Sequence, residues 1–302
     1  MAEPDISAEV FAAAIDRLCA QRDRHVVVKL GGSAMEDPAA TETCLRSVAT
    51  LTRLGISVVL VHGGGKPIDR AMAEAGLTPK KVAGRRYTDD ATLAIVVRVL
   101  DEINVALVNR LAMFCGAHGA YHVEGGPWFS FPSVSGEGYP VIGRRLFLPG
   151  SDGQPIDLGH VGAVTRVDVD RLLHCLHQGI TLVLPSVAAS EDGGWLNVNA
   201  DTVASAVAGA LKADKAIFLT DTPGVLRDRA DPKSLFPKLT EAECRDLIRS
   251  GVIDGGMVPK VEACFEALEA GASAALILDG RVPYSLLDVF LHDTFTGTVI
   301  TR

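Results

Sequence analysis

The sequence predicts an α/β fold in which a largely parallel central sheet is flanked by helices. Runs rich in Val and Leu at residues 26–30 and 58–61 are typical of strands that are buried on both faces of a sheet. A helical pattern with a proline near its start follows each run, at residues 38–55 and 66–76. This β-α-β-α order implies parallel strands that are joined by right-handed crossovers.

The next elements follow in order along the chain. Apolar side chains recur at helical spacing before residue 20, so a helix is expected ahead of the first core strand. Residues 80–88 carry four basic side chains around a glycine and predict a short hairpin or loop. Residues 89–111 predict a long helix with a broad apolar surface, which we expect at the centre or at an interface. Residues 125–162 combine glycine, proline and aromatic side chains, and predict hairpins and loops that cover a site as a flap.

The second half of the sequence repeats the alternation of strands and helices. Its expected elements are strands at 180–185, 216–221 and 274–279, and helices that begin at Asp168, Asn199, Thr240, Gly255 and Tyr284. The domain prediction is an N-terminal helix in residues 1–24, a first lobe in 25–185 and a second lobe in 186–302. Composition marks no linker between the lobes, so we expect them to share one continuous sheet.

The composition argues against several kinds of partner. Hydrophobic residues make up 48% and charged residues 22% of the chain, and no apolar run approaches the ~18 residues of a membrane-spanning helix. The net charge of −8 and the scattered basic residues argue against nucleic acid as a partner. The acidic N-terminus is unlike a secretory signal, so we expect a cytoplasmic protein.

Cysteine and histidine spacing predicts no resident metal ion. The six cysteines lie far apart and form no Cys-x-x-Cys pair, so we expect reduced thiols in the core. His174 and His177 could share one helical face, but the sequence offers no further ligands beside them. Mg²⁺ could still arrive with the phosphates of a nucleotide.

Two glycine runs directly follow the first two strands. Gly31 and Gly32 come just after Lys29, and residues 63–65 are three consecutive glycines. Glycine lets a backbone approach a ligand closely, and a lysine within an apolar strand needs an anionic partner. We infer two neighbouring sites for phosphates or carboxylates. The alternative is a pair of tight turns without a ligand, and neither run matches a P-loop or the Gly-x-Gly-x-x-Gly pattern.

Three ionisable residues suit phosphoryl transfer. Lys29 lies on a strand, Lys260 opens a helix behind two glycines, and Asp201 ends the sequence Asn-Val-Asn-Ala-Asp. Phosphoryl transfer needs positive charge on the moving group and little covalent chemistry from the protein. An aspartate between the two lysines would hold their ammonium groups in place. A carboxylate acceptor (pKa about 4.3) is already ionised near neutral pH and needs no general base.

Eight ordered stretches that include these residues resemble the amino acid kinase family over nearly the whole chain. They are Val-Lys-Leu-Gly-Gly-Ser-Ala-Met (28–35), Val-His-Gly-Gly-Gly (61–65), Gly-Arg-Arg-Tyr-Thr-Asp (84–89), Leu-Gly-His-Val-Gly (158–162), Asn-Val-Asn-Ala-Asp (197–201), Leu-Thr-Asp-Thr-Pro-Gly-Val-Leu (219–226), Gly-Gly-Met-Val-Pro-Lys-Val (255–261) and Asp-Gly-Arg-Val-Pro (279–283). The number and the order of these matches make a chance similarity untenable.

The resemblance implies a three-layer sandwich and an activity. The activity is ATP-dependent phosphorylation of the γ-carboxylate of N-acetyl-L-glutamate, in arginine biosynthesis. The first lobe would bind this acceptor and the second lobe would bind the nucleotide. Lys29 and Lys260 would stabilise the transferring phosphoryl group, and Asp201 would orient both lysines.

The resemblance also implies contacts for each substrate. The residues expected at the acceptor are Gly64, Gly65, Arg86, Asn197 and Asn199, and those expected at the nucleotide are Gly31, Gly32, Thr220, Asp221, Gly256 and Met257. The amides of Gly32 and Gly64 would donate to phosphate oxygens, while Arg86 and Asn197 would hold the α-carboxylate of the acceptor. Asn199 could instead only cap a helix, and Arg86 could be a surface arginine.

Two stretches depart from the family pattern and leave alternatives open. The segment 121–145 replaces a strand and a Gly-x-Asp-Gly loop, which leaves the acceptor less certain than the reaction class. Residues 294–298 differ where arginine-inhibited members border their effector site, so feedback inhibition is doubtful. One alternative is a sister kinase that acts on aspartate, free glutamate, carbamate or an aminoadipate derivative. The other is a non-catalytic relative that senses or stores a ligand, against which the two intact lysines argue.

The N-terminal helix bears on assembly. Arginine-regulated members of the family use an additional N-terminal helix to interlace dimers into a hexameric ring. Residues 6–20 have the length and the apolar stripe for that use. We therefore expect a homo-oligomer, either a dimer built on the central helices around residues 89–115 or a hexamer.

Overall fold

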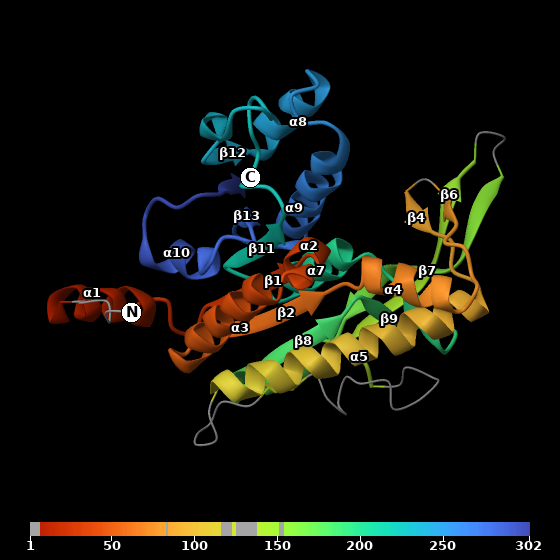
Figure 1. Cartoon of the computed structure of the whole chain (residues 1–302), viewed down its shortest axis with the longest axis horizontal. Coiled ribbons are helices and arrows are strands. Elements are labelled where there is room, and N and C mark those ends of the chain that lie inside the picture. Colours follow the sequence, from red (N-terminus) through yellow and green to blue (C-terminus); the bar gives the residue numbers. More distant parts are fainter. Residues whose placement is uncertain (1–6, 83, 116–122, 125–137, 151–153) are drawn as a thin grey trace.

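A mixed, mostly parallel sheet forms the centre of the protein. The computed structural model describes residues 7–82, 84–115, 123–124, 138–150 and 154–302. Eight strands of this described part pair in the order β12-β14-β13-β11-β1-β2-β8-β5 (Figure 1). All neighbours are parallel except β13 and β14. The strands are β1 (His25–Leu30), β2 (Ser57–His62), β5 (Val123–Glu124), β8 (Thr181–Pro185), β11 (Lys215–Thr220), β12 (Lys238–Thr240), β13 (Ala275–Asp279) and β14 (Thr298–Thr301).

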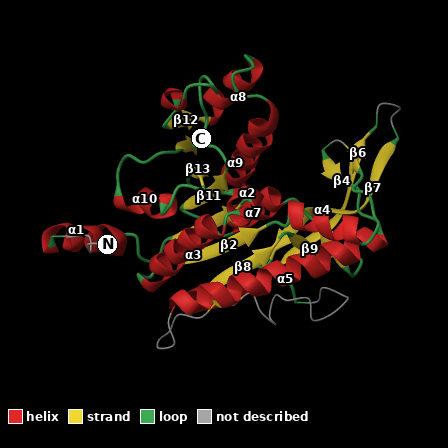
Figure 2. Ribbon diagram, viewed as in Figure 1, coloured by secondary structure: helices red, strands yellow, loops and turns green. Residues whose placement is uncertain are grey.

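Helices lie on both faces of this sheet, as Figure 2 shows. They are α1 (Ala8–Cys19), α2 (Gly32–Glu36), α3 (Pro38–Arg53), α4 (Gly65–Glu74), α5 (Asp90–Cys115), α6 (Val169–His177), α7 (Ala200–Ala210), α8 (Glu241–Arg249), α9 (Val258–Ala270) and α10 (Ser285–Leu291), with 3₁₀ turns η1 (Pro232–Ser234) and η2 (Gly255–Met257). This arrangement confirms the predicted α/β sandwich with its N-terminal helix.

The alternation of side chains along each strand separates the core into two layers. Val26 and Val28 of β1 belong to one apolar cluster, which also contains buried side chains of α3 and α10. Val27 of β1 and Phe218 of β11 belong to the other cluster, which contains buried side chains of α6, α7 and α9. The apolar strands predicted at 26–30 and 58–61 are therefore buried on both faces, which requires helices on both sides of the sheet.

A small closed barrel extends from one end of the sheet. It contains β6 (Val141–Pro149), β7 (Pro155–Val167), β9 (Val187–Ser190) and β10 (Trp195–Asn197). A two-stranded hairpin, β3 (Lys81–Val82) and β4 (Arg85–Arg86), lies near it because Thr88 bridges to Gly159 of β7. Gly159 has φ +70°, and a Cβ at this position would stand 2.2 Å from the Thr88 carbonyl oxygen. Only glycine allows this close approach, which fixes the hairpin against the barrel.

Several elements differ from the sequence-based expectations. The hairpins expected in residues 125–162 are confirmed in part, because β6 and β7 pair as an antiparallel hairpin, while their further pairing with β9 and β10 closes a barrel that the sequence did not predict. Residues 125–137 of the expected flap and residues 121–122 of the divergent segment lie outside the described residues. The expectation that the chain ends with the helix at 284–290 was wrong, because β14 adds a further strand that pairs with β13. The sheet includes strands from both sides of residue 185.

Two helices carry exposed apolar side chains. Val10 and Phe11 of α1 are 63% and 60% exposed, and Leu18 is the buried residue of that helix. Figure 1 shows α1 at one end of the molecule beside α10, where the Arg17 guanidinium donates to the Leu291 carbonyl oxygen. Met113, near the end of α5, is 69% exposed. No helix in the described part of the chain is long and apolar enough to cross a membrane.

Candidate active site

The carboxyl ends of β1 and β2 form the base of the site, and Lys29 lies one residue before the end of β1. Its neighbours Val28 and Leu30 are buried in the core, while the Lys29 side chain keeps 14% of its surface exposed. The Lys29 Nζ lies 2.8 Å from Oδ1 of Asp201, in the first turn of α7. This ion pair confirms the expected anionic partner of a lysine on an apolar strand.

The glycines after the two strands fall into two structural kinds. A Cβ on Gly31 would lie 2.6 Å from the Leu219 carbonyl oxygen, and one on Gly64 would lie 2.9 Å from the Leu100 side chain. Packing therefore explains these two glycines. A Cβ on Gly32 or Gly65 would meet no protein atom within 4 Å. Those two positions face open space, so the approach of a ligand explains glycine there better than packing does.

A cleft of about 580 Å³, which we call the central cleft, opens above these glycines. Its lining comes from segments far apart in the sequence and includes most of the residues that the sequence predicted for the site. These are Lys29, Gly31, Gly32, Gly64, Gly65, Arg86, Asn197, Asn199, Thr220, Asp221 and Lys260. Because the carboxyl ends of parallel strands meet at one edge of a sheet, segments far apart in sequence converge here.

Arg86 is held by α4 at the side of the central cleft. Its Nη1 lies 2.5 Å from Oδ1 of Asp69, and its Nη2 donates to the Gly65 carbonyl oxygen at 3.3 Å. The Arg86 side chain is 11% exposed, so it is largely buried rather than a free surface arginine. These contacts fix the guanidinium plane beside the glycine loop, where it can bind a carboxylate through two nitrogens.

Asn197 faces the same region from the end of β10. Its Nδ2 donates to the Thr88 hydroxyl at 3.0 Å, and that hydroxyl donates to the Arg86 carbonyl oxygen at 3.0 Å. These two hydrogen bonds connect the barrel to the β3–β4 hairpin. The amide oxygen of Asn197 takes no part in them. Asn199, by contrast, accepts from the backbone N–H of Asp201 at 2.8 Å and caps α7. The helix-capping role that the sequence allowed for Asn199 is therefore seen in the structure.

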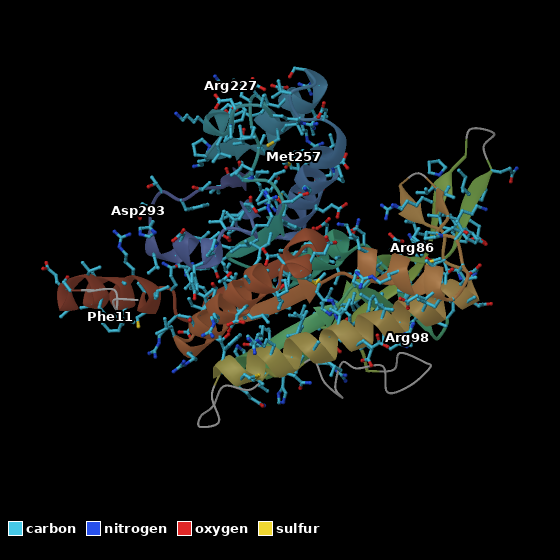
Figure 3. All side chains as sticks on the ribbon, viewed as in Figure 1. Phe11, Arg86, Arg98, Arg227, Met257 and Asp293 are labelled. Atoms are coloured by element: carbon cyan, nitrogen blue, oxygen red, sulfur yellow. The ribbon has the colours of Figure 1, made fainter. Side chains whose placement is uncertain are left out.

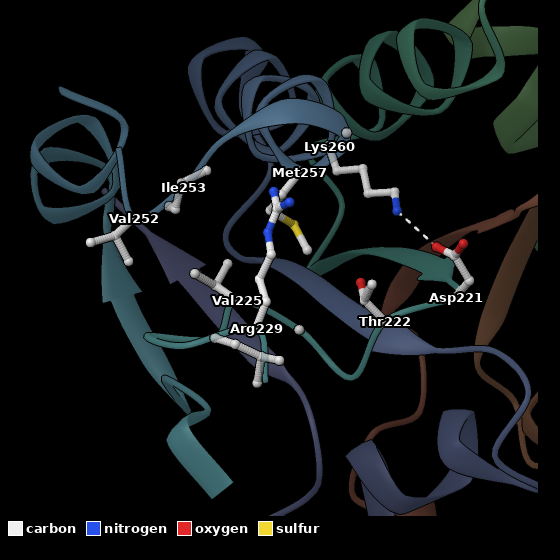
Figure 4. Close-up of a pocket in the computed structure, with 11 residues that line it drawn as sticks. Asp221, Thr222, Val225, Arg229, Val252, Ile253, Met257 and Lys260 are labelled. Atoms are coloured by element: carbon white, nitrogen blue, oxygen red, sulfur yellow. Dashed lines mark hydrogen bonds and ion pairs between the residues drawn. The ribbon is translucent and has the colours of Figure 1, made fainter. Parts of the chain in front are cut away.

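A second pocket of about 330 Å³, the side pocket, adjoins the central cleft and shares Asp221 and Lys260 with it. Gly256 and Met257, the other predicted nucleotide contacts, line this pocket (Figure 4). Its remaining lining is largely apolar and comes from Val225, Leu226, Val252 and Ile253, with Thr222, Gly224 and Arg229. Figure 3 shows Met257 and Arg86 in different parts of the molecule, Met257 in the turn before α9 and Arg86 on β4.

Lys260 has a different partner from the one that the sequence suggested. Its Nζ donates to Oδ1 of Asp221 at 3.0 Å, and this hydrogen bond lowers the pKa of the Asp221 carboxyl. Arg281 adds positive charge nearby, since its Nη2 donates to the Asp221 carbonyl oxygen at 2.6 Å. The expected contact of Asp201 with Lys29 is present in the structure, and its expected role toward Lys260 stays a prediction. Asp201 pairs with Lys29 and Asp221 pairs with Lys260, because the two lysines approach the cleft from different elements.

Sequence reasoning missed several residues of the site. Asp69 and Glu36 were not singled out, yet Asp69 holds Arg86 and Glu36 lies 2.6 Å from Lys66 at the rim of the cleft. Arg281 belongs to a recognised stretch but received no role. A carboxylate on a helix surface carries no local signal of its partner, so these pairs appear only once the fold is known.

In the described ranges, no group of three or more His, Cys, Asp or Glu side chains could hold a metal ion. The Nε2 of His174 lies 3.0 Å from the Gln178 side chain on the same helix. The six cysteines lie on helices or at their ends, and all but Cys19 are buried, which agrees with the expected position of the thiols in the core.

The fold and the site together define a class of α/β protein in which cationic side chains from distant segments line a cleft at the carboxyl ends of parallel strands, the place where such folds bind ligands. Residues 24–279 match the Amino acid kinase family, and the chain belongs to that family. This confirms the resemblance that the eight sequence stretches carried.

Individual relatives match nearly the full length. The chain is 40% identical over 303 residues to the acetylglutamate kinase of Synechococcus sp. (strain RCC307), which covers 99% of this chain and 96% of that protein. It is 37% identical over 278 residues to the acetylglutamate kinase of Clostridioides difficile (strain 630), with 92% and 91% covered. Both relatives carry the same name, acetylglutamate kinase.

Two solved structures show the same fold. An N-acetylglutamate synthase from Neisseria gonorrhoeae, complexed with coenzyme A and N-acetyl-glutamate, superimposes with a TM-score of 0.78 at 23% identity and covers 99% of this chain. This chain spans 64% of that synthase's length. A carbamate kinase from Giardia lamblia bound to AMP-PNP gives a TM-score of 0.62 at 14% identity, with 92% and 98% covered.

Proposed function

We propose that this protein phosphorylates the γ-carboxylate of N-acetyl-L-glutamate with ATP and so forms N-acetyl-L-glutamyl 5-phosphate for arginine biosynthesis. The observation that carries the proposal is the near-complete match to acetylglutamate kinases at 37–40% identity. The central cleft supports it, because its cations come from both lobes and suit two anionic substrates.

The nucleotide binds in the side pocket with its phosphates directed to the central cleft. The apolar walls at Val225, Ile253 and Met257 suit a flat heterocyclic base, which binds through its apolar faces. Asp221 and Lys260 lie where the two pockets meet, and Gly256 offers close backbone approach on the same side. Gly31, Gly32 and Thr220 line the adjoining part of the central cleft, at the phosphate end of the nucleotide.

The acceptor binds on the other side of the central cleft. Arg86 and Asn197 hold its α-carboxylate, since a buried guanidinium with a fixed plane is suited to bidentate binding of a carboxylate. Gly64 and Gly65 open the first turn of α4 with no side-chain cap, so the amides of that turn can donate to an anion. Asn199 contributes less, because its side chain caps α7.

The transfer step relies on electrostatic stabilisation. The acceptor's γ-carboxylate is ionised and attacks the terminal phosphorus atom, and ADP leaves as the bond to its oxygen breaks. Lys29 and Lys260 meet the negative charge of the moving phosphoryl group. Their carboxylate partners Asp201 and Asp221 hold the two ammonium groups in position before the substrates arrive. No proton needs to be removed from the acceptor.

Mg²⁺ fits this arrangement as an ion that the nucleotide phosphates hold. A Mg²⁺ ion in kinases binds through one or two carboxylates together with substrate phosphates, and the described residues offer no larger cluster. Asp221 is the carboxylate at the junction of the two pockets and would approach the ion. The ion would offset part of the charge on the phosphates.

Assembly and location complete the proposal. We expect a cytoplasmic homo-oligomer, a dimer or a hexamer. The exposed apolar side chains of α5 and α1 support contacts with further copies of the chain, since exposed Met113 and Phe11 are costly to leave in water. Whether another copy of the chain covers α1 decides between the dimer and the hexamer.

An acyl phosphate assay tests the proposed reaction. Purified protein, ATP and Mg²⁺ are mixed with one acceptor at a time, and hydroxylamine traps the acyl phosphate as a hydroxamate while ADP is measured in parallel. We expect both products with N-acetyl-L-glutamate, and little with L-glutamate, L-aspartate, carbamate or an aminoadipate derivative. Faster turnover of another acceptor would assign the protein to a sister kinase, and no turnover with any acceptor would favour a ligand-sensing role.

A further inference from the structure

The β3–β4 hairpin places an arginine in the central cleft to which neither the family motif nor the proposed roles above assign a function. Arg85 lines the cleft together with Arg86, and its side chain is half-buried. No hydrogen bond or ion pair joins its guanidinium to another residue in the described part of the chain. A half-buried guanidinium that faces a cleft without a hydrogen-bonded or ion-paired partner is available for a bound anion.

Arg85 differs in this respect from the other large cations of the cleft. Four of them have a carboxylate partner within 3.0 Å. These pairs are Lys29 with Asp201, Lys66 with Glu36, Arg86 with Asp69, and Lys260 with Asp221. The paired cations are already neutralised in part before a ligand binds. The hairpin therefore supplies the cations of the cleft that have no carboxylate within ion-pair distance among the described residues, which are Arg85 and the more exposed Lys81.

The side chain of Arg85 is directed away from the acceptor-binding arginine. Successive side chains of a strand point to opposite sides, and Arg86 contacts Asp69, on α4. Arg85 consequently points away from α4 and into the cleft. On the far side stands α9, which begins with the turn that holds Lys260. Partial desolvation raises the pKa of Glu266 on α9, and the positive charge of Arg85 opposes this rise from across the cleft.

We propose that Arg85 contacts the terminal phosphoryl group of the bound nucleotide from the acceptor side of the cleft and remains on it during transfer. This inference rests on the proposed function. The planar fork of a guanidinium can hold two phosphoryl oxygens at once, which the ammonium group of Lys29 or Lys260 cannot do. Arg85 thus approaches the group from the lobe opposite Lys260, and ties the two lobes together only when the terminal phosphate is present.

Binding of two nucleotides to Arg85→Met separates this role from general attraction of anions. Calorimetry with Mg²⁺ compares AMP-PNP, which has a terminal phosphate, with ADP, which lacks it. A charge-assisted contact contributes roughly 1.5–3 kcal/mol, so affinity for AMP-PNP should fall by about 10-fold or more, and affinity for ADP by less than about 3-fold. Arg85→Lys should keep part of the AMP-PNP affinity. Lys80→Met is the matched control, because Lys80 carries the same charge on the exposed side of the hairpin, stacked on Tyr87.

Kinetics and acceptor binding complete the test. In Arg85→Met we expect the affinity for N-acetyl-L-glutamate alone to stay within about 2-fold and kcat to fall by about 10-fold or more. Equal losses for ADP and AMP-PNP, a loss of acceptor affinity instead, or effects no larger than those of Lys80→Met would each overturn the inference. If the wild type phosphorylates no acceptor, the proposed function fails, while the comparison of AMP-PNP with ADP still decides the role of Arg85.

Discussion

Lys29 on β1 and Asp201 on α7 form an ion pair in which Nζ and Oδ1 are 2.8 Å apart. Both side chains are largely buried, at 14% and 21% exposed, so the desolvation of each charge is offset mainly by the other. Lys260 and Asp221 form a more open pair with the aspartate 52% exposed. The site therefore holds two lysines with separate carboxylate partners, one on β1 and one on α9.

Removal of either lysine should abolish most of the turnover. Lys29→Met and Lys260→Met each lose a charge that meets the transferring phosphoryl group, so we expect kcat to fall by at least ~10²-fold with a smaller change in acceptor affinity. Steady-state kinetics and calorimetry measure the two effects. Lys238→Met, on the exposed edge of β12, serves as the control. Near-normal turnover in Lys260→Met would remove its proposed role.

Acceptor recognition should depend on the geometry of Arg86. Arg86→Lys keeps the charge and loses the two-nitrogen fork, so the acceptor KM should rise by about 10-fold or more while the ATP KM changes little. Asp69→Asn should produce a smaller rise of the same kind, because Asp69 only holds one guanidinium nitrogen. Both KM values are measured by ADP release. Unchanged acceptor KM values in both variants would place Arg86 outside the acceptor site.

The two adjacent glycines after β1 should respond differently to alanine. The Cβ of Gly31→Ala would collide with the Leu219 carbonyl oxygen at 2.6 Å, so we expect a loss of unfolding free energy of about 1–3 kcal/mol. Gly32→Ala meets no protein atom within 4 Å, so stability should be kept while the KM for ATP rises. Thermal unfolding and kinetics distinguish the two. An unaltered KM in a stable Gly32→Ala protein would mean that no ligand approaches that backbone.

Stability should fall in mild acid because of His62. This imidazole is fully buried, with Nε2 3.1 Å from Oδ1 of Asn104, and burial lowers its pKa from the ordinary 6.5. Below pH 6.5 the unfolded chain takes up a proton that the folded chain does not, so unfolding free energy decreases by up to about 1.4 kcal/mol per pH unit. His62→Gln should flatten this dependence between pH 7 and pH 5 in thermal unfolding. A parallel dependence in both proteins would exclude His62 as its source.

The N-terminal helix should control assembly rather than catalysis. The exposed Val10 and Phe11 would each contribute roughly 1.5–3 kcal/mol if covered by another copy of the chain. Removal of residues 1–20 should therefore convert a larger oligomer into an active dimer, as measured by light scattering. Val10→Ser with Phe11→Ser should give the same result while keeping the Arg17 contact with Leu291. If the full-length protein is already a dimer, α1 has no such role.

Local patterns predicted the parts of the fold that depend on neighbours in sequence. The buried strands around Val27 and Val59, the proline-started helix at Pro38 and the glycine turns were all recognisable, because burial on two faces and backbone freedom select specific residue types. The barrel was not predicted. Its strands β6 and β7 pair with β9 and β10, and such pairing leaves only a weak trace in a segment rich in glycine and proline.

The sequence by itself determined the family, the apolar strands and some of the residues that line the two pockets, since these follow from residue type and from ordered motifs. Tertiary structure alone decided the charge pairing within the site. Asp201 pairs with Lys29, Asp221 pairs with Lys260, and Asp69 holds Arg86. The physical reason is that an ion pair acts over a few ångströms, and the parallel register of β2, β1 and β11 sets which distant side chains come within that distance.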